Sequence, residues 1–290
     1  MRIGLVDVDG HNFPNLALMK ISAWFKKHGH TVEWANSLEH YDKVYMAKVF
    51  DFTPDDLQAY QTDELIQGGT GYDMTVRLPD CIEHCYPDYG LYGITDTAYG
   101  YLTRGCPRQC PFCIVADKEG TASVAVAGLA EFWRGQKKIK LLDPNILACR
   151  DWKVLLLQLA ASGAEVDFTQ GLDARLLTDE KVKAIRACNY KILHFAWDNV
   201  NDDYTPKILA KYVDKWGLRQ DKLKVYVLTN YNSSHAQDLY RIYKLREIGY
   251  DPFVMIYDKY NAPVKTRHLQ RWCNNKIIFN SEPDFANYKP

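Results

Sequence analysis

The segment KIKLLDPNILACRDWKVLLLQLAASGAEVDFTQ (138–170) decides the fold class of this chain. Its two ends, 138–143 and 165–170, are apolar runs with strand character, and residues 151–162 between them predict a helix. A strand, a helix and a second strand in this order predict a βαβ unit, in which the two strands are parallel. The segment therefore predicts an α/β protein with a mostly parallel sheet.

The same alternation continues on both sides of this segment. YLTRG (101–105) precedes it as a strand, and a helix at 264–273 near the C-terminus leads to KIIFN (276–280). Between them we expect strands at 191–198, 224–230 and 252–258 and helices at 178–187, 205–216 and 235–248. A series of about six βα units indicates an open or closed α/β barrel, in which ligands bind beyond the carboxyl ends of the strands.

The N-terminal residues predict a smaller α/β unit. The expected strands are 2–8, 31–36 and 43–50, and the expected helices are 15–28 and 53–61, the second of which begins with Thr-Pro and two acids. Residues 77–97 have few regular signals and two prolines. We therefore expect an N-terminal domain over 1–76, a linker over 77–97, and a core with a C-terminal extension over 98–290.

The composition limits the classes of partner. The 290 residues include 36 Lys and Arg and 36 Asp and Glu, and a zero net charge gives no general attraction to nucleic acids or membranes. The sequence has no apolar run that could span a bilayer, and the N-terminus lacks the pattern of a signal peptide. We expect a cytoplasmic protein, whose eight cysteines are thiols or metal ligands rather than disulfides.

Three of these cysteines lie in GCPRQCPFC (105–113), directly after a predicted strand. Thiolates at this spacing can converge on one centre, either an iron–sulfur cluster or zinc. A structural zinc site normally has four protein ligands, so a set of three leaves one position open for a substrate. The alternatives are a zinc site completed by Cys81, His84 or Cys85, and a cluster that only transfers electrons.

The Cys-x3-Cys-x2-Cys spacing, with an aromatic residue before the last Cys, resembles the signature of the radical S-adenosylmethionine superfamily. YLTRGCP (101–107) resembles the branch of that superfamily with an N-terminal cobalamin-binding-like domain. The resemblance implies a partial (β/α)6 barrel and a four-iron, four-sulfur cluster on Cys106, Cys110 and Cys113. It also implies that the fourth iron binds S-adenosylmethionine, whose reductive cleavage gives a 5′-deoxyadenosyl radical that modifies an unknown substrate. A reducing partner such as flavodoxin or ferredoxin would supply the electron.

The resemblance also implies that residues at the strand ends hold S-adenosylmethionine. Asp143 stands where the superfamily often has Gly-Gly-Glu, a segment that contacts the methionyl amino group. The alternative interpretation of Asp143 is a turn or helix-capping residue. Arg175 either pairs with the methionyl carboxylate or forms a structural bridge to Asp173 or Asp143. The complete set of candidates is Phe112, Asp143, Asn145, Gln170, Asp173, Arg175, Asp198, Asn230 and Tyr257.

The N-terminal unit resembles a small Rossmann-like cobalamin-binding domain. Asp9, Gly10 and His11 follow its first strand, where such domains can carry a cobalt-ligating His, and Gly68 begins a glycine pair. The last Gly of that motif is Pro14 here. We therefore expect a cap over the barrel rather than a cobalamin carrier, with cobalamin-dependent radical methyl transfer as the alternative function.

The other features have two interpretations each. Cys81 and Cys85 are four residues apart, so they form either part of a second metal site or two thiols on one helix face. The basic residues of 265–276 contact RNA or form a solvated helix face. We expect the isolated Cys149, Cys188 and Cys273 to be buried as small hydrophobic residues. A non-catalytic iron–sulfur or zinc-binding module is the alternative from another functional class.

Overall fold

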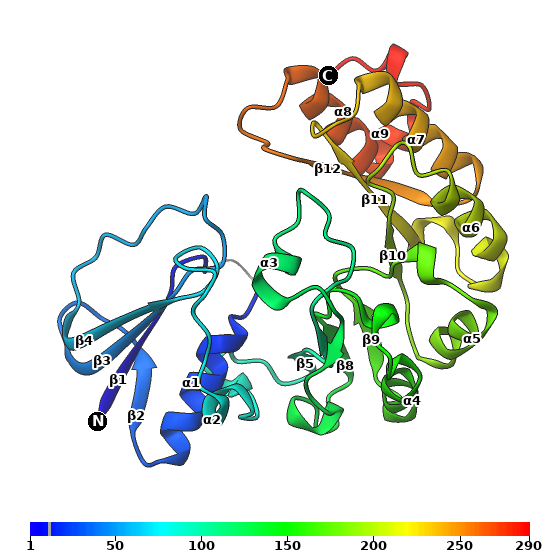
Figure 1. The fold of residues 1–290 in the computed structure, drawn as a ribbon. Helices are drawn as coiled ribbons and strands as arrows, with labels where there is room; N and C mark the ends of the chain where they lie inside the picture. The colour runs from blue at the N-terminus through cyan, green and yellow to red at the C-terminus, as the bar shows by residue number, and fades with distance from the viewer. Residues whose placement is uncertain (11–12) are drawn as a thin grey trace. The chain divides into compact units, whose positions relative to one another are not determined.

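The computed structural model describes residues 1–10 and 13–290, and the chain divides into two compact units (Figure 1). Unit 1 comprises Met1–Gly100 and Ala127–Lys137, and unit 2 comprises Tyr101–Val126 and Lys138–Pro290. Residues 77–97, the expected linker, lie within unit 1. The chain is mixed α/β with parallel sheets, as the strand–helix alternation predicted. Among the helices that the structure describes, none combines the length and the apolar composition needed to cross a lipid bilayer.

Unit 1 contains a parallel four-stranded sheet in the order β2-β1-β3-β4. Leu5 of β1 is opposite Trp34 of β2, and Val6 of β1 is opposite Met46 of β3. The strands are β1 (Arg2–Asp7), β2 (Thr31–Trp34), β3 (His40–Ala47) and β4 (Gln61–Gly68). The chain crosses from β2 to β3 past β1. Because all three strand pairs are parallel, the carboxyl ends of the four strands lie at the same edge of the sheet.

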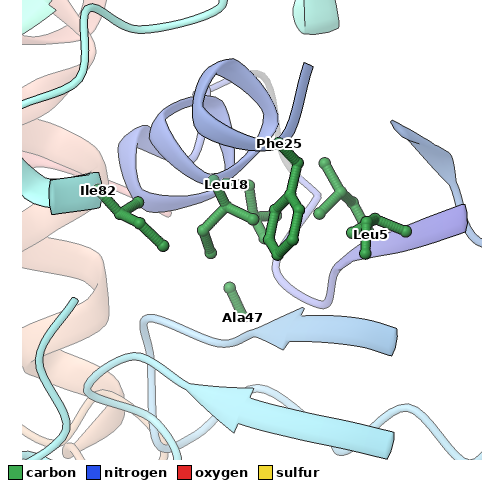
Figure 2. Close-up of a cluster of buried hydrophobic side chains, with 7 residues drawn as sticks. Leu5, Leu18, Phe25, Ala47 and Ile82 are labelled. Atoms are coloured by element: carbon green, nitrogen blue, oxygen red, sulfur yellow. The ribbon is translucent and has the colours of Figure 1, made fainter. Parts of the chain in front are cut away.

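Helix α1 (Leu16–Lys27) covers one face of this sheet. The Asn15 side chain caps the helix by accepting a hydrogen bond from the Leu18 backbone N–H, at 3.2 Å. Apolar residues recur at helical spacing in α1, so the helix presents one apolar face. β1 is buried on both faces, and Ile3 and Leu5 point to the side of α1 while Val6 packs with Val44 and Met46 on the other side. The apolar face of α1 and the facing side of β1 meet in a buried core (Figure 2) that includes Ile3, Leu5, Leu18, Ile21, Phe25, Ala47 and Ile82.

The helix predicted over 53–61 is wrong, because this segment is a loop that leads into β4. The Asp56 carboxylate accepts hydrogen bonds from the Gln58 N–H and the Tyr60 hydroxyl, at 2.9 and 2.7 Å. Leu57 is 93% exposed, so the segment has no apolar face that a helix could bury. Strand β4 escaped prediction because it is largely exposed and its sequence, QTDELIQG, lacks strand-like alternation.

The rest of unit 1 includes the segment 127–137, which returns to it after an excursion through unit 2. The buried Tyr89 hydroxyl donates to the Phe132 carbonyl oxygen at 2.7 Å and accepts from the Tyr99 N–H at 2.9 Å. Gly100 lets Phe132 pack closely, because a Cβ there would lie 2.2 Å from the ring. The elements involved are α2 (Asp80–Glu83), β5 (Thr97–Gly100) and the 3₁₀ turns η1 (Tyr89–Tyr92) and η2 (Leu129–Glu131).

Unit 2 contains the strands that the sequence predicted between 138 and 258 (Figure 1). β8 (Lys138–Leu141) pairs in parallel with β9 (Glu165–Phe168), and β10 (Leu193–Ala196), β11 (Leu223–Thr229) and β12 (Asp251–Ile256) form a parallel sheet. β6 (Thr103–Arg104) and β7 (Val124–Ala125) form a short antiparallel pair. The strand expected at 101–105 is wrong in part, because only the two-residue β6 forms there and it pairs antiparallel with β7. An isolated parallel bridge joins Leu172, beyond β9, to Phe195 of β10.

Helices alternate with these strands. They are α3 (Val115–Glu119), α4 (Trp152–Ser162), α5 (Asp179–Ala187), α6 (Tyr204–Tyr212), α7 (His235–Glu247), α8 (Val264–Asn274) and α9 (Lys276–Ser281). The 3₁₀ turns are η3 (Ile146–Ala148), η4 (Ala174–Leu176), η5 (Val213–Lys215), η6 (Gln220–Lys222) and η7 (Phe285–Asn287). KIIFN, which follows the last predicted helix, lies in α9, where the Asn275 side chain caps the first turn. Cys149, Cys188 and Cys273 are buried, as predicted.

Candidate metal centre

Cys106, Cys110 and Cys113 lie on one loop between β6 and α3. The Cys106 N–H donates to the Gly120 carbonyl oxygen at 3.1 Å, and the Cys113 N–H donates to that of Cys110 at 2.9 Å. Gly105 enters the loop with φ of 83°, and a Cβ there would lie 2.2 Å from the Ala122 carbonyl oxygen. The backbone thus requires glycine before the first thiol. All three thiols are free, and each is at least partly exposed.

The sequence left two metal groups open for these thiols, a zinc ion and an iron–sulfur cluster. Within residues 1–10 and 13–290, no three His, Cys, Asp or Glu side chains are grouped so that they could hold one metal ion. A zinc ion needs all its ligands around one atom. In a four-iron cluster each thiolate binds a different iron, so the sulfurs stand farther apart. The choice between a zinc ion and an iron–sulfur cluster on these three thiols stays a prediction.

The cysteine loop is tied to the segments beyond β8 and β9. Arg108 donates from Nε to Asp173 Oδ2 at 2.6 Å, and Arg175 donates from Nε to Asp173 Oδ1 at 2.7 Å. Burial alone would raise the pKa of Asp173, but the hydrogen bonds and charges of Arg175 and Arg108 hold it below its ordinary value. Arg175 thus forms the structural bridge to Asp173, and its contact with a methionyl carboxylate stays a prediction.

Asn145 joins a cysteine to this ion-paired group. Its Nδ2 lies 3.5 Å from Cys106 Sγ and 3.3 Å from Asp173 Oδ2. The residue is buried, and its Oδ1 atom has no hydrogen-bond partner in the described part of the chain. A buried amide oxygen without a donor is costly, so this position favours a bound group that carries an N–H or O–H.

Burial and a nearby positive charge act in opposite directions on the pKa of Cys110. Burial raises the pKa of the Cys110 thiol, while the positive charge of Arg175 lowers it. Burial is the larger effect, so the pKa of Cys110 is raised, and Arg175 offsets only part of this increase.

Asp143 is buried and supports the strand that leads to the cysteine loop. Its carboxylate accepts from the Leu102 N–H at 2.8 Å and from the Thr103 N–H and hydroxyl at 2.7 and 2.6 Å. Burial raises the pKa of Asp143 to about 7, although these donors favour the charged form. These contacts give Asp143 a structural role that differs from the turn or helix cap expected as its alternative, because they join it to residues about 40 positions earlier in the sequence. Its role in cofactor binding stays a prediction.

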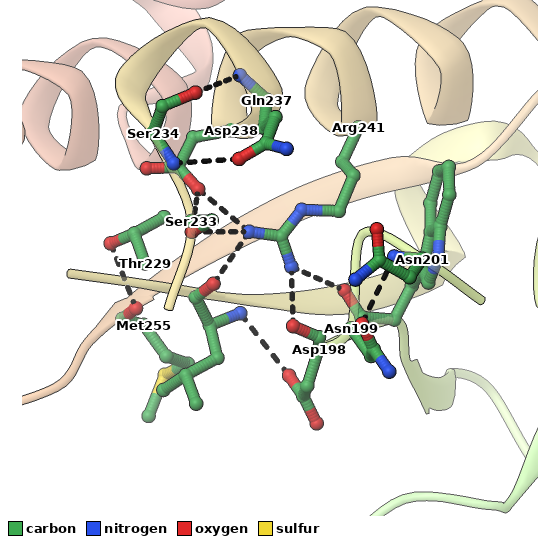
Figure 3. A network of polar contacts seen from close by, with 12 residues as sticks. Asp198, Asn199, Asn201, Thr229, Ser233, Ser234, Gln237, Asp238, Arg241 and Met255 are labelled. Carbon is green, nitrogen blue, oxygen red and sulfur yellow. Dashed lines mark hydrogen bonds and ion pairs between the residues drawn. The ribbon is translucent and has the colours of Figure 1, made fainter. Parts of the chain in front are cut away.

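A buried guanidinium holds the carboxyl ends of β10 and β11 together (Figure 3). Arg241 of α7 donates to the carbonyl oxygens of Trp197, Asp198 and Leu228 at 2.9, 2.8 and 2.7 Å, and to Asp238 Oδ1 at 2.6 Å. Asp198 Oδ1 accepts from the Leu228 N–H at 3.1 Å, and burial raises the pKa of Asp198. Sequence reasoning missed Arg241, although Asp and Arg three residues apart on a helix were a signal for an ion pair.

Aromatic side chains connect the cysteine loop to the ends of β11 and β12. Phe112 packs edge-on against Tyr231 at 5.4 Å between ring centroids, and Tyr231 packs against Tyr257 at 5.0 Å. Asn230 has φ of 61° and donates from Nδ2 to the Tyr257 carbonyl oxygen at 2.8 Å. Three candidates thus come together with Tyr231, which the sequence did not identify. Gln170 is exposed, and its role stays a prediction.

The remaining candidates lie elsewhere. In unit 1 the Cys85 thiol donates to the Cys81 carbonyl oxygen at 3.2 Å, and His84 Nδ1 lies 2.8 Å from Glu131 Oε2. No third ligand for Cys81 and Cys85 stands near them in the portion of the chain that the structure describes. Arg271 of α8 is exposed while its neighbour Trp272 is buried in the core, and exposure of Arg271 fits both a solvated helix face and contact with RNA. His11, the proposed cobalt ligand, lies outside the described residues.

No protein-family model matches the chain. No curated protein matches its sequence.

Proposed function

We propose that this chain is a radical S-adenosylmethionine enzyme with a four-iron, four-sulfur cluster on Cys106, Cys110 and Cys113. The observation that carries the proposal is the attachment of the cysteine loop to Asn145, beyond β8, and to Asp173, beyond β9. Both contacts lie beyond the carboxyl ends of parallel strands, where α/β proteins bind their ligands. Three thiols with an open fourth position suit a cluster that also binds a substrate.

The proposal includes a partial (β/α)6 barrel as the fold of unit 2. The parallel pairs β8–β9 and β10–β11–β12 support it, and so does the Leu172–Phe195 bridge between them. We also infer a cytoplasmic location, because free thiols persist in a reducing compartment.

The cluster, when bound, would supply one electron to the sulfonium of S-adenosylmethionine, which breaks into methionine and a 5′-deoxyadenosyl radical. The residues around the loop would orient the cosubstrate. Asn145 Oδ1 is buried beside Cys106 without a donor, so it can accept a hydrogen bond from the methionyl amino group. Arg175 adds positive charge for the carboxylate. The Phe112–Tyr231–Tyr257 group offers aromatic faces for adenine.

Anaerobic reconstitution with iron and sulfide tests the proposal. The wild-type chain should bind iron and sulfide, become brown, and form 5′-deoxyadenosine when S-adenosylmethionine and dithionite or titanium(III) citrate are added. A flavodoxin or ferredoxin should replace the chemical reductant. If a cluster forms but S-adenosylmethionine stays intact with every reductant, the chain is a non-catalytic iron–sulfur module and the proposal fails.

A cysteine variant tests the ligand assignment separately. Cys110→Ala should lose both the cluster and the cleavage activity, while Cys188→Ala, which removes a buried thiol far from the loop in sequence, should keep both. Retained cleavage in Cys110→Ala would refute the assignment. For the cobalamin alternative, a corrin absorption band retained after incubation with hydroxocobalamin and desalting would support radical methyl transfer.

A further inference from the structure

Unit 1 contains a cavity of about 530 Å³ that the proposed cluster chemistry does not use. Asp7 and Trp34, the last residues of the parallel strands β1 and β2, line it together with Tyr92 and with Asp56 and Tyr60 of the β3–β4 loop. Ligand pockets in proteins have volumes of about 300–1,000 Å³. The cavity therefore has the size for a molecule such as a nucleoside, at the edge of the sheet where α/β proteins bind ligands.

The walls of the cavity are rich in aromatic rings. Trp34 and Tyr92 pack edge-on at 5.1 Å between ring centroids, with 74° between the ring planes. Tyr60 adds a further ring to the lining. Aromatic faces attract cations through the ring quadrupole and also provide flat surfaces for planar ligands.

The charged side chains in the described part of the lining are carboxylates. Asp7 Oδ2 accepts from the Tyr92 hydroxyl at 2.6 Å, and Asp56 Oδ2 accepts from the Tyr60 hydroxyl at 2.7 Å. Neither carboxylate has a Lys or Arg within ion-pair distance among the residues that the structure describes, and no Lys or Arg belongs to the described lining. Two carboxylates without a cation favour a ligand that brings positive charge.

The start of α1, next to the cavity, does not offer the usual site for a phosphate. Helix N-termini bind phosphates through free backbone N–H groups. Here Pro14, which lines the cavity, has no N–H, and the Asn15 side chain already accepts from Leu18. Together with the two carboxylates, this capping disfavours dinucleotides and other phosphate esters.

We propose that this cavity binds an organic cation of nucleoside size, either an alkylated or protonated heteroaromatic base or an aromatic amine. The aromatic walls hold the planar part of the ligand, while Asp7 and Asp56 neutralise its charge. The proposal is independent of the iron–sulfur chemistry, because it rests on residues of unit 1 and on equilibrium binding.

Three acridines with the same ring system and different charges test this proposal at pH 8. The probes are 9-aminoacridine, which is a cation, acridine, which is neutral, and acridine-9-carboxylate, which is an anion. Their binding to the full chain, without S-adenosylmethionine or reductant, is measured by fluorescence titration and confirmed by equilibrium dialysis. The cation should bind at least about tenfold more tightly than the neutral probe, and the anion most weakly.

Variants assign the binding to the cavity. Asp7→Asn and Asp56→Asn each keep an oxygen that accepts the tyrosine hydroxyl but lose the charge, so each should weaken the binding of 9-aminoacridine about fivefold or more. The matched control is Asp51→Asn, on an exposed residue of the same loop that is not part of the lining. Equal affinities for the three probes would overturn the proposal. So would wild-type affinity in both cavity variants when circular dichroism shows that they are folded.

Discussion

Removing the buried guanidinium of Arg241 should destabilise unit 2 far more than removing an exposed charge from the same helix. Arg241 is 0% exposed, and the side chain of its partner Asp238 is 4% exposed. In Arg241→Met the Asp238 carboxylate stays buried without its cation. Breaking a buried ion pair in this way costs about 3–5 kcal/mol, and we expect that loss in the free energy of unfolding.

Two further variants separate this charge effect from loss of packing. Arg241→Met combined with Asp238→Leu removes both charges, so the double variant should recover part of the lost free energy of unfolding. The recovery is only partial, because the carbonyl oxygens at the ends of β10 and β11 that accept hydrogen bonds from Arg241 still lack a donor. Lys244→Met breaks an exposed ion pair with Glu247 on the same helix and should cost less than about 1 kcal/mol.

Urea unfolding followed by far-ultraviolet circular dichroism measures these free energies. Because the chain has two compact units, hydrogen exchange read by mass spectrometry identifies which unit opens. Peptides covering 193–199 and 223–234 should lose protection in Arg241→Met and keep it in Lys244→Met. The reasoning would be refuted if Arg241→Met were as stable as Lys244→Met, or if the double variant were no more stable than Arg241→Met.

Three further predictions concern pH, packing and thiol reactivity. Burial raises the pKa of Asp143 to about 7, above roughly 3.9 in an unfolded chain, so the contribution of this carboxyl group to stability is full below pH 4 and is lost as the pH rises through 7. The difference in unfolding free energy between wild type and Asp143→Asn should therefore fall over this range. A flat or rising difference would contradict the prediction. Gly100→Ala places a Cβ against the Phe132 ring and should lower the stability of unit 1 by about 1–3 kcal/mol, measured by thermal unfolding. Gly128→Ala serves as the control, because a Cβ at Gly128 meets no atom within 4 Å. Equal unfolding midpoints for the two variants would refute the close contact. Burial raises the pKa of Cys273 to about 12, so iodoacetamide at pH 8 should not alkylate this thiol until urea unfolds the chain. Mass spectrometry measures the alkylation. Rapid labelling of Cys273 in the folded chain would contradict the prediction.

The sequence by itself determined the α/β class and most of the elements of unit 2. Apolar runs such as 138–143 and helical periodicity such as that of 235–248 are properties of consecutive residues, so they could be read directly. The three thiols of 106–113 were equally visible, because their spacing is local. Strand β4 was missed because a polar strand at the edge of a sheet buries too little to leave a periodic pattern.

Only the tertiary structure decided which distant residues meet. It joined Arg108 to Asp173 and Phe112 to Tyr231, and it returned residues 127–137 to unit 1. It also brought the ends of β1 and β2 together with Asp56 around the aromatic cavity. Contacts between residues that are far apart in sequence depend on the path of the whole chain, and local spacing carries no record of that path.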